Sequence, residues 1–316
     1  MTRPVRAEPA PALHGVLVVD KPAGPTSHDV VARVRRLTGT RRVGHTGTLD
    51  PLATGVLPLV LGRATRLARF LGGGEKRYEA RIRLGAATDT FDAEGAVTWT
   101  SPPPGAEGWA GLPSADAVAA TLAAFVGVIE QVPPAFSAKK VGGVAAHRLA
   151  RRHHPVPLAP ARVELRRAEL VACREGLADV RLACSQGFYV RALAHELGVR
   201  LGCGAHLAAL RRTASGEFDE AEAVPLDVLE ANPSLASTRL VGLDRLLPGT
   251  PAARLTERGA ALAAHGASVV AADVAGWLDG RPGGPVRLLG PDGHLIAVAT
   301  GVVGPGVPLH PAVVLV

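Results

Sequence analysis

The chain has 316 residues, of which 47% are hydrophobic and only 3% aromatic, and it carries a net charge of +7. This length suits two domains, and the positive charge favours a polyanionic partner, either a nucleic acid or an anionic membrane surface. The longest early apolar run, at 16–19, is too short for a signal peptide or a membrane span, and the three cysteines show no paired spacing. We therefore expect a cytoplasmic protein that does not enter a membrane.

The first half of the chain predicts alternating strands and helices around one irregular loop. In chain order we expect a loose tail at 1–13, a strand at 15–20, a helix capped by Thr26 or Ser27 and ended by Gly39, a loop at 44–55, a strand at 56–61, a short helix at 64–71 and a strand at 78–84. The loop contains three glycines, three threonines and a proline, so its backbone conformation is unusual.

The second half adds two strands, a basic excursion and a different C-terminal composition. We expect a Pro/Gly connector at 100–113, a helix at 115–126, a basic excursion at 131–160, strands at 164–172 and 177–184, and a helix at 189–201. From 251 to 316 the chain has four arginines and four acidic residues, so the whole net charge lies in residues 1–250. Short segments broken by Gly and Pro predict a small β-barrel there.

Asp50 is the strongest candidate for a catalytic group. It lies in the Gly/Thr loop immediately before Pro51, and His45 precedes it by five residues. An aspartate before proline commonly serves only to cap a turn, and the residues alone leave that alternative open. The histidines lack metal-ligand spacing, and the chain has no P-loop, so the sequence predicts neither a metal nor a nucleotide cofactor.

The two tyrosines and one basic run suggest how a nucleic acid would bind. Tyr78 opens an alternating strand, and Tyr189 lies beside Arg191. A phenol can stack on a base, donate a hydrogen bond or accept a proton, although two ordinary buried tyrosines explain the pattern equally well. Residues 131–163 contain six basic residues and no acidic one, which favours phosphate contacts over a merely solvated surface. The candidates for these contacts in the insertion at 131–160 are Lys139, Lys140, Arg148, Arg151 and Arg152.

Six blocks of this sequence, in order, resemble the bacterial TruB family of tRNA pseudouridine synthases. They are GVLVVDKPAGPTSHDVV, RRVGHTGTLDPLATGVLPLVLGRATR, KRYEARIRLGAATDTFDAEG, VPPAFSAKKVGGVAAHRLAR, CSQGFYVRALAHELG and LGCGAHLAALRRT. The resemblance implies an α+β pseudouridine-synthase fold with a central mixed, largely antiparallel sheet. It places a catalytic domain at 14–247 and a PUA-like RNA-binding β-barrel at 248–316.

The resemblance also implies an activity and a set of site residues. The family isomerises uridine to pseudouridine at the T-loop position of tRNA called 55. Asp50 matches the catalytic aspartate, and Arg191 matches an arginine that forms an ion pair with it. The resemblance also implies four substrate contacts. His45 matches a histidine that enters the T-loop, Tyr78 and Tyr189 match two tyrosines of the pocket, and Leu210 matches an apolar residue near the target base. The family more often has lysine at the position of Arg66, and the arginine preserves the positive charge there.

The chemistry of this reaction is consistent with these residues. Uracil is detached from the ribose at N1 and reattached at C5, so the reaction needs no redox change and no external nucleophile, which agrees with the missing cofactor and metal motifs. We expect a monomer that acts on the T-stem-loop without a protein partner. The target base must leave its stack. An ionised carboxylate held by Arg191 is required, and Tyr78 is a candidate base for the C5 proton. Asp50 acts on the sugar, on the base or in the loss of a proton.

Two alternatives compete with this interpretation. One is an inert RNA-binding protein that keeps the scaffold, and the joint presence of Asp50, Tyr78 and Arg191 argues against it. The other is the same reaction on a different RNA, as in the related guide-dependent enzymes of archaea and eukaryotes. The bacterial-type insertion at 131–160 argues for an enzyme that acts alone.

Overall fold

The computed structural model describes residues 12–103, 106, 111–137, 139–141, 144–145, 158–278, 284–300 and 308–316. In its first half the elements are β1 (Gly15–Lys21), α1 (Ser27–Thr38), β2 (Val43–His45), β3 (Thr54–Leu61), η1 (Gly62–Leu67), α2 (Ala68–Leu71), β4 (Lys76–Leu84), β5 (Ala86–Thr88), β6 (Val97–Thr100), α3 (Ala115–Ala123), β7 (Gly127–Gln131), β8 (Lys140–Val141) and β9 (Val144–Ala145).

The second half contains the longest strands and a separate C-terminal unit. Its elements are β10 (Ala161–Arg174), β11 (Leu177–Cys184), α5 (Val190–Arg200), β12 (Ala205–Ser215), β13 (Phe218–Asp219), β14 (Val224–Pro225), α6 (Leu226–Ala231), α7 (Leu235–Thr238), β15 (Val241–Gly242), η2 (Leu243–Arg245), β16 (Ala252–Leu255), α8 (Glu257–Ala264), η3 (Ala271–Asp273), β17 (Val274–Leu278), β18 (Val286–Leu289), β19 (Leu295–Thr300) and β20 (His310–Val314).

Local sequence signals explain the ends of α1 and the pattern of β4. Thr26 caps α1 in a reciprocal capping box with Asp29, and Gly39 ends the helix at φ 63° in the left-handed region. Burial alternates strictly along β4, as expected for a strand with one face on the core. The strand begins at Lys76, two residues before the expected start.

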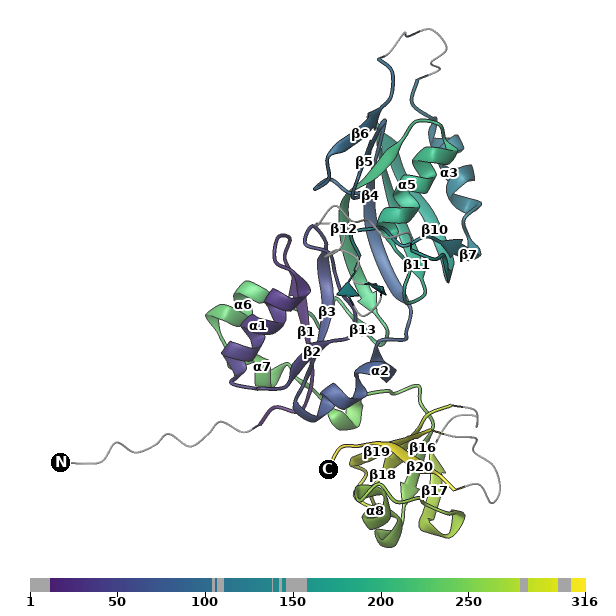
Figure 1. Ribbon diagram of the computed structural model, residues 1–316. Coiled ribbons are helices and arrows are strands. Elements are labelled where there is room, and N and C mark those ends of the chain that lie inside the picture. The colour runs from purple at the N-terminus through teal and green to yellow at the C-terminus, as the bar shows by residue number, and fades with distance from the viewer. Residues whose placement is uncertain are drawn as a thin grey trace, which may run out of the picture.

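A large mixed sheet organises residues 15–242 (Figure 1). Its main path runs β14-β1-β3-β12-β4-β11-β10-β7. The β1–β14 and β3–β12 pairs are parallel, and the remaining pairs along this path are antiparallel. The expected α+β class with a mixed sheet is therefore confirmed. Strand β12, which we did not anticipate, joins the two halves of the sheet, and α5 packs against it.

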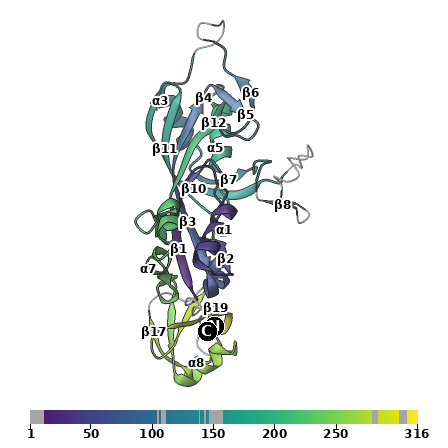
Figure 2. The same cartoon turned by 90° about the vertical axis from the view of Figure 1, so that its left-hand side faces the viewer.

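The C-terminal unit forms a second sheet at one end of the molecule (Figure 2). Its five strands follow the open order β17-β16-β18-β19-β20 around their own apolar core. No closed barrel is found among the described residues, so the expected β-barrel is not confirmed. A shared core with β1 and β3 and two hydrogen bonds attach this unit: Arg66 Nη1 to the Val314 carbonyl (2.6 Å) and Arg69 Nη2 to the Ala312 carbonyl (3.3 Å). Within the described ranges, no helix is long and apolar enough to cross a membrane.

Candidate active site

A buried lysine anchors the loop between β2 and β3, which contains Asp50. Lys21 lies at the end of β1 and donates to the carbonyls of Pro22 (2.9 Å), Pro51 (3.2 Å) and Ala53 (2.7 Å). Burial lowers the pKa of Lys21 to about 8, although Asp50 opposes this shift. Lys21 thus fixes the part of the loop that follows Asp50 to the end of β1.

Arg212 on β12 anchors the same loop from its other side. Its side chain is buried and donates to the carbonyls of Val56 (2.7 Å) and Gly47 (3.1 Å). The parallel pairing of β3 with β12 brings the Arg212 backbone so close that a Cβ at Gly55 would lie 2.2 Å from the Arg212 carbonyl oxygen. Gly55 also has φ +98°, so only glycine fits here without strain.

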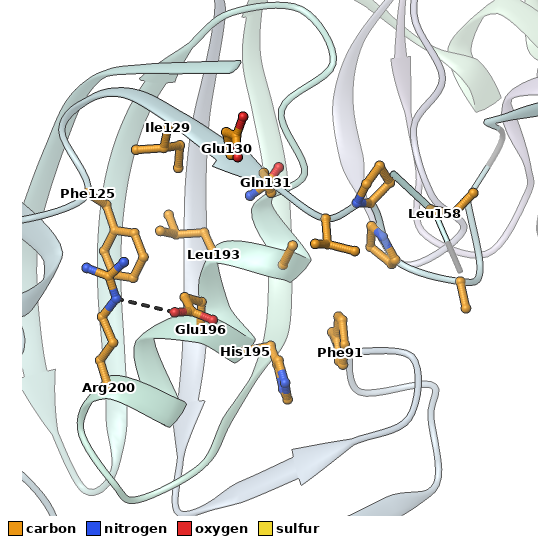
Figure 3. Close-up of a pocket in the computed structure, with 15 residues that line it drawn as sticks. Phe91, Phe125, Ile129, Glu130, Gln131, Leu158, Leu193, His195, Glu196 and Arg200 are labelled. Atoms are coloured by element: carbon orange, nitrogen blue, oxygen red, sulfur yellow. Dashed lines mark hydrogen bonds and ion pairs between the residues drawn. The ribbon is translucent and has the colours of Figure 1, made fainter. Parts of the chain in front are cut away.

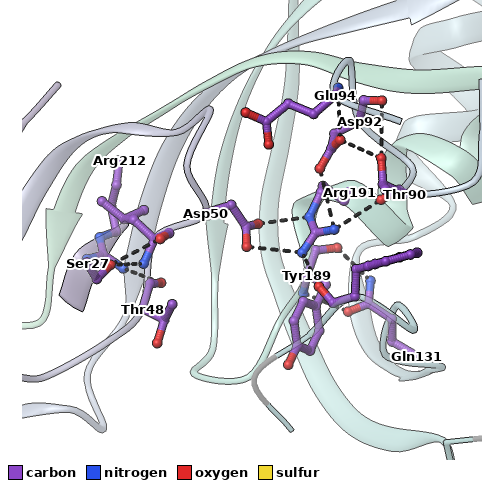
Figure 4. Close-up of polar contacts among 12 residues, drawn as sticks. Ser27, Thr48, Asp50, Thr90, Asp92, Glu94, Gln131, Tyr189, Arg191 and Arg212 are labelled. Carbon is purple, nitrogen blue, oxygen red and sulfur yellow. Dashed lines mark hydrogen bonds and ion pairs between the residues drawn. The ribbon is translucent and has the colours of Figure 1, made fainter. Parts of the chain in front are cut away.

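Asp50 and Arg191 form a bidentate ion pair (Figure 4). The guanidinium donates from Nε to Oδ2 (2.8 Å) and from Nη2 to Oδ1 (3.1 Å). Arg191 lies in the first turn of α5 with its side chain 4% exposed, whereas the Asp50 side chain is 31% exposed. Arg191 also donates to the carbonyls of Thr90 (3.0 Å) and Phe136 (3.1 Å). The structure therefore brings together the two residues predicted to form an ion pair.

A second carboxylate, that of Asp92, was not predicted from the sequence and completes this network. Asp92 is buried with Oδ2 3.4 Å from Arg191 Nη1, and it accepts hydrogen bonds from the Thr90 hydroxyl (2.6 Å) and the Glu94 amide (3.1 Å). Between Thr90 and Asp92, Phe91 has φ +66°, which is costly for a bulky residue. Its ring stacks on His195 at 3.9 Å between centroids. The one sequence signal was the dense Thr/Asp pattern of TDTFDAEG.

A cavity of about 250 Å³ lies beside the ion pair. Its lining includes five of the expected site residues, namely Asp50, Tyr78, Tyr189, Arg191 and Leu210. Burial raises the pKa of Tyr78, against the influence of Arg212, and burial also raises the pKa of Tyr189. Both phenols are therefore neutral near pH 7.

Lys76 and His45 complete the surroundings of this cavity. Lys76, a lining residue not anticipated from the sequence, is buried and donates to the carbonyls of Gly72 (2.9 Å) and Gly74 (2.8 Å). Burial, together with Arg212, lowers the pKa of Lys76 to about 8. His45 is not among the lining residues; it precedes the lining residue Thr46 and contacts the His28 ring edge-on at 5.4 Å. Burial, helped by His28, lowers the pKa of His45 to about 4, so its imidazole is neutral.

The structure covers only part of the basic insertion. Lys139 is partly exposed, and Lys140 begins β8. Arg148, Arg151 and Arg152 lie outside the described residues.

A second basic surface, not singled out from the sequence, lies around the end of α1, the start of β2, η1 and α2. We call it the arginine surface; its exposed members are Arg35, Arg36, Arg41, Arg42, Arg63, Arg66 and Arg69. Arg33 on α1 forms an ion pair with Glu230. Among the described residues, none of the seven members of the arginine surface forms an ion pair. Four of its arginines line a cavity of about 500 Å³ that also reaches Val316. This surface therefore provides unneutralised positive charge beside the C-terminal unit.

Comparison with known protein families gives matches along most of the chain. Residues 35–190 match the sequence model described as TruB family pseudouridylate synthase (N terminal domain), and residues 191–248 match the model described as tRNA pseudouridylate synthase B C-terminal domain.

Curated relatives and solved structures agree with these family matches. The chain is 46% identical to tRNA pseudouridine synthase B of Mycobacterium sp. (strain KMS), covering 88% of this chain and 92% of that protein. It is 42% identical to the protein of the same name from Syntrophotalea carbinolica, covering 91% of this chain and 92% of that protein. Its fold is similar to that of a chain in an H/ACA RNP bound to a substrate RNA containing 2'-deoxyuridine (TM-score 0.73, 23% identity, 96% of this chain and 85% of that one).

Proposed function

Because the chain belongs to the TruB family of pseudouridylate synthases, we propose that it isomerises uridine to pseudouridine in tRNA, at the T-loop position called 55. The observation that carries this proposal is the Asp50–Arg191 ion pair beside a cavity that two tyrosines line. The reaction breaks the N1–C1′ bond, turns the uracil and joins C5 to C1′. It needs a fixed charge and a place for one base outside its stack, and this cavity offers both.

Asp50 is the proposed catalytic residue. Its ion pair with Arg191 stabilises the charged carboxylate, and its partial exposure leaves oxygen lone pairs open to the cavity. A carboxylate in this place can attack ribose C1′, attack the base or accept a proton from the sugar. Each route needs the same negative charge, so loss of that charge is predicted to stop all three.

Tyr78, Tyr189 and Leu210 are proposed to hold the flipped uracil. All three line the cavity, and aromatic rings replace the stacking that a base loses when it leaves a helix. Tyr78 lies on β4 opposite Arg212 of β12, and the Arg212 guanidinium opposes the rise of its pKa. Because the phenol is neutral near pH 7, Tyr78 must first pass its own proton to solvent or to another group before it can accept the C5 proton. The Arg212 cation would stabilise the resulting phenolate, which supports Tyr78 as that acceptor.

The remaining contacts are proposed to place the tRNA over this cavity. His45 is neutral and lies next to the cavity, so it can enter a loop of stacked bases without bringing a charge. The insertion at 131–160, with Lys139, Lys140, Arg148, Arg151 and Arg152, is proposed to contact phosphates, together with the arginine surface. We further propose that 14–247 is the catalytic domain, that 248–316 is a PUA-like RNA-binding module, and that the enzyme acts as a cytoplasmic monomer.

Release of the C5 hydrogen provides a direct test. A T-stem-loop carrying tritium at C5 of the target uridine should release tritium to water with the purified protein alone, and the same RNA with tritium in another uridine should not. Binding without release would favour the inert RNA-binding protein. Release only after a guide RNA and partner proteins are added would favour the guide-dependent alternative.

A further inference from the structure

One side-chain amide, that of Gln131, pairs with both backbone groups of Tyr189 (Figure 4). Gln131 is the last residue of β7, the edge strand of the large sheet, and only 8% of it is exposed. Its Nε2 donates to the Tyr189 carbonyl (3.0 Å), and its Oε1 accepts from the Tyr189 amide (2.8 Å). The side chain thus makes the two backbone hydrogen bonds that a neighbouring strand would otherwise make.

Tyr189 is the residue whose conformation sets the start of α5. It is the N-cap of the helix, with extended backbone angles (φ −108°, ψ 108°) and no side-chain cap. Arg191 follows two residues later and holds Asp50. A rotation at Tyr189 would therefore move the phenol in the cavity and also the guanidinium that positions the carboxylate.

The first residues of the insertion contact the same two side chains. The Phe136 carbonyl accepts from Arg191 Nη2 (3.1 Å), and the Ser137 side chain is hydrogen-bonded to the Tyr189 side chain. Residues 131–137 are thus connected to Tyr189 through its backbone and its phenol, and to Arg191 through its guanidinium. The insertion and the ion pair cannot shift independently while these contacts persist.

We propose that Gln131 is a positioning residue for the reaction. It holds Tyr189 and, through the first turn of α5, aligns Arg191 with Asp50, and it links this alignment to the place where the insertion leaves the sheet. The inference rests on the proposed function, because it assigns Gln131 a part in that same reaction. A buried amide with a purely structural role would affect stability, whereas this role affects the chemical step.

Gln131→Glu separates these roles because its hydrogen-bonding pattern depends on pH. The carboxylate can accept from the Tyr189 amide but cannot donate to the Tyr189 carbonyl. The protonated acid has one donor and one acceptor, as the amide has. Burial against a carbonyl raises the pKa of such a carboxyl, so its protonated fraction is larger at pH 5.5 than at pH 8.

Other titratable groups near Gln131 are the same in every variant. A cavity of about 620 Å³ next to it is lined by Glu130, His195, Glu196 and Arg200 as well as by Gln131 itself (Figure 3). Gln131 itself contacts the Tyr189 backbone, and Arg191 contacts the Phe136 carbonyl farther along the same segment. Wild-type protein measured at each pH therefore controls for all of them, and Gln131→Met, which has neither hydrogen bond and no titration, is the matched variant.

The experiment measures single-turnover conversion and dissociation constant for a T-stem-loop at pH 8 and pH 5.5. At pH 8 we expect Gln131→Glu to react about 10- to 100-fold more slowly than wild type, with the dissociation constant within about twofold. At pH 5.5 its rate should return to within about threefold of wild type, while Gln131→Met stays slow at both pH values. Thermal melts at both pH values confirm that each variant is folded.

The possible results distinguish a failure of the positioning role from a failure of the proposed function. Wild-type rates for Gln131→Met, or a folded Gln131→Glu that stays slow at pH 5.5, would overturn the positioning role alone. If Gln131→Glu does not fold at pH 8, the Gln131→Met rate decides the question. A folded wild-type protein that yields no pseudouridine would overturn the proposed function and this inference with it.

Discussion

Asp92→Asn tests whether Arg191 needs two carboxylates to hold Asp50 in place. Asp92 is 3% exposed, and its Oδ2 lies 3.4 Å from Arg191 Nη1. Asparagine keeps the oxygen that accepts from Thr90 and Glu94, but it removes the charge and can place an amide donor against a guanidinium donor. Asp50 then becomes the remaining ionic partner of Arg191 in the described network.

The expected size of the effect follows from the contact that is lost. The lost contact is a buried ion pair at 3.4 Å, and the loss of a charged contact of this kind costs about 1.5–3 kcal/mol. If that loss appears in the chemical step, it corresponds to a rate decrease of roughly 10- to 150-fold. The assay is single-turnover conversion of a T-stem-loop with enzyme in excess, together with RNA affinity, which should change little.

Asp89→Asn is the matched control for this measurement. Asp89 lies in the same turn and accepts from the Ala96 amide (2.8 Å), but it is exposed and does not contact Arg191. It should convert RNA at the wild-type rate. Equal rates for both variants and wild type would refute the reasoning, because the Asp92 contact would then have no part in the alignment of Asp50.

Three further predictions concern the base, the phosphates and the histidine. Tyr78→Phe should retain RNA affinity within about threefold but lose product formation, as measured by tritium release; near-normal turnover would restrict Tyr78 to stacking. Lys139→Ala and Arg41→Ala should each reduce the slope of log affinity against log salt by ~0.7–0.9, and unchanged slopes would show that these cations do not contact RNA. Because the pKa of His45 is about 4, the imidazole stays neutral as pH rises from 5.5 to 8, so the rate should show no step near pH 6.5 that depends on His45. A step that disappears in His45→Gln would contradict this.

The elements predicted well from the sequence are those whose signals are local. The caps at Thr26 and Gly39 and the alternation of β4 depend on neighbouring residues, and the structure confirms them. Strand β12 lacks such a signal because its pairing with β4 is irregular between Leu207 and Ala209 and again after Arg212. Each irregularity shifts the alternation of buried and exposed side chains, so the sequence does not show a regular period of two.

The parts of the site missed from the sequence depend on tertiary contacts. Asp92 reaches Arg191 because the chain reverses between β5 and β6, a pairing that joins Thr88 to Val97. Lys76 and Arg212 are buried cations, whereas charged residues in a sequence are ordinarily taken as exposed. The expected C-terminal barrel was inferred from short segments broken by Gly and Pro. That composition shows strands but not whether their first and last members pair.

Conversion of a T-stem-loop by Asp50→Asn protein is the most direct test of the proposed chemistry. The substitution is nearly isosteric and removes the charge that Arg191 holds, so the complex should still form, with affinity changed by about 1–2 kcal/mol at most. The measurement is single-turnover formation of pseudouridine with protein purified free of host enzyme. We predict that RNA binds and that no pseudouridine is formed. Conversion at a rate near that of wild type would contradict the assignment of Asp50 as the catalytic carboxylate.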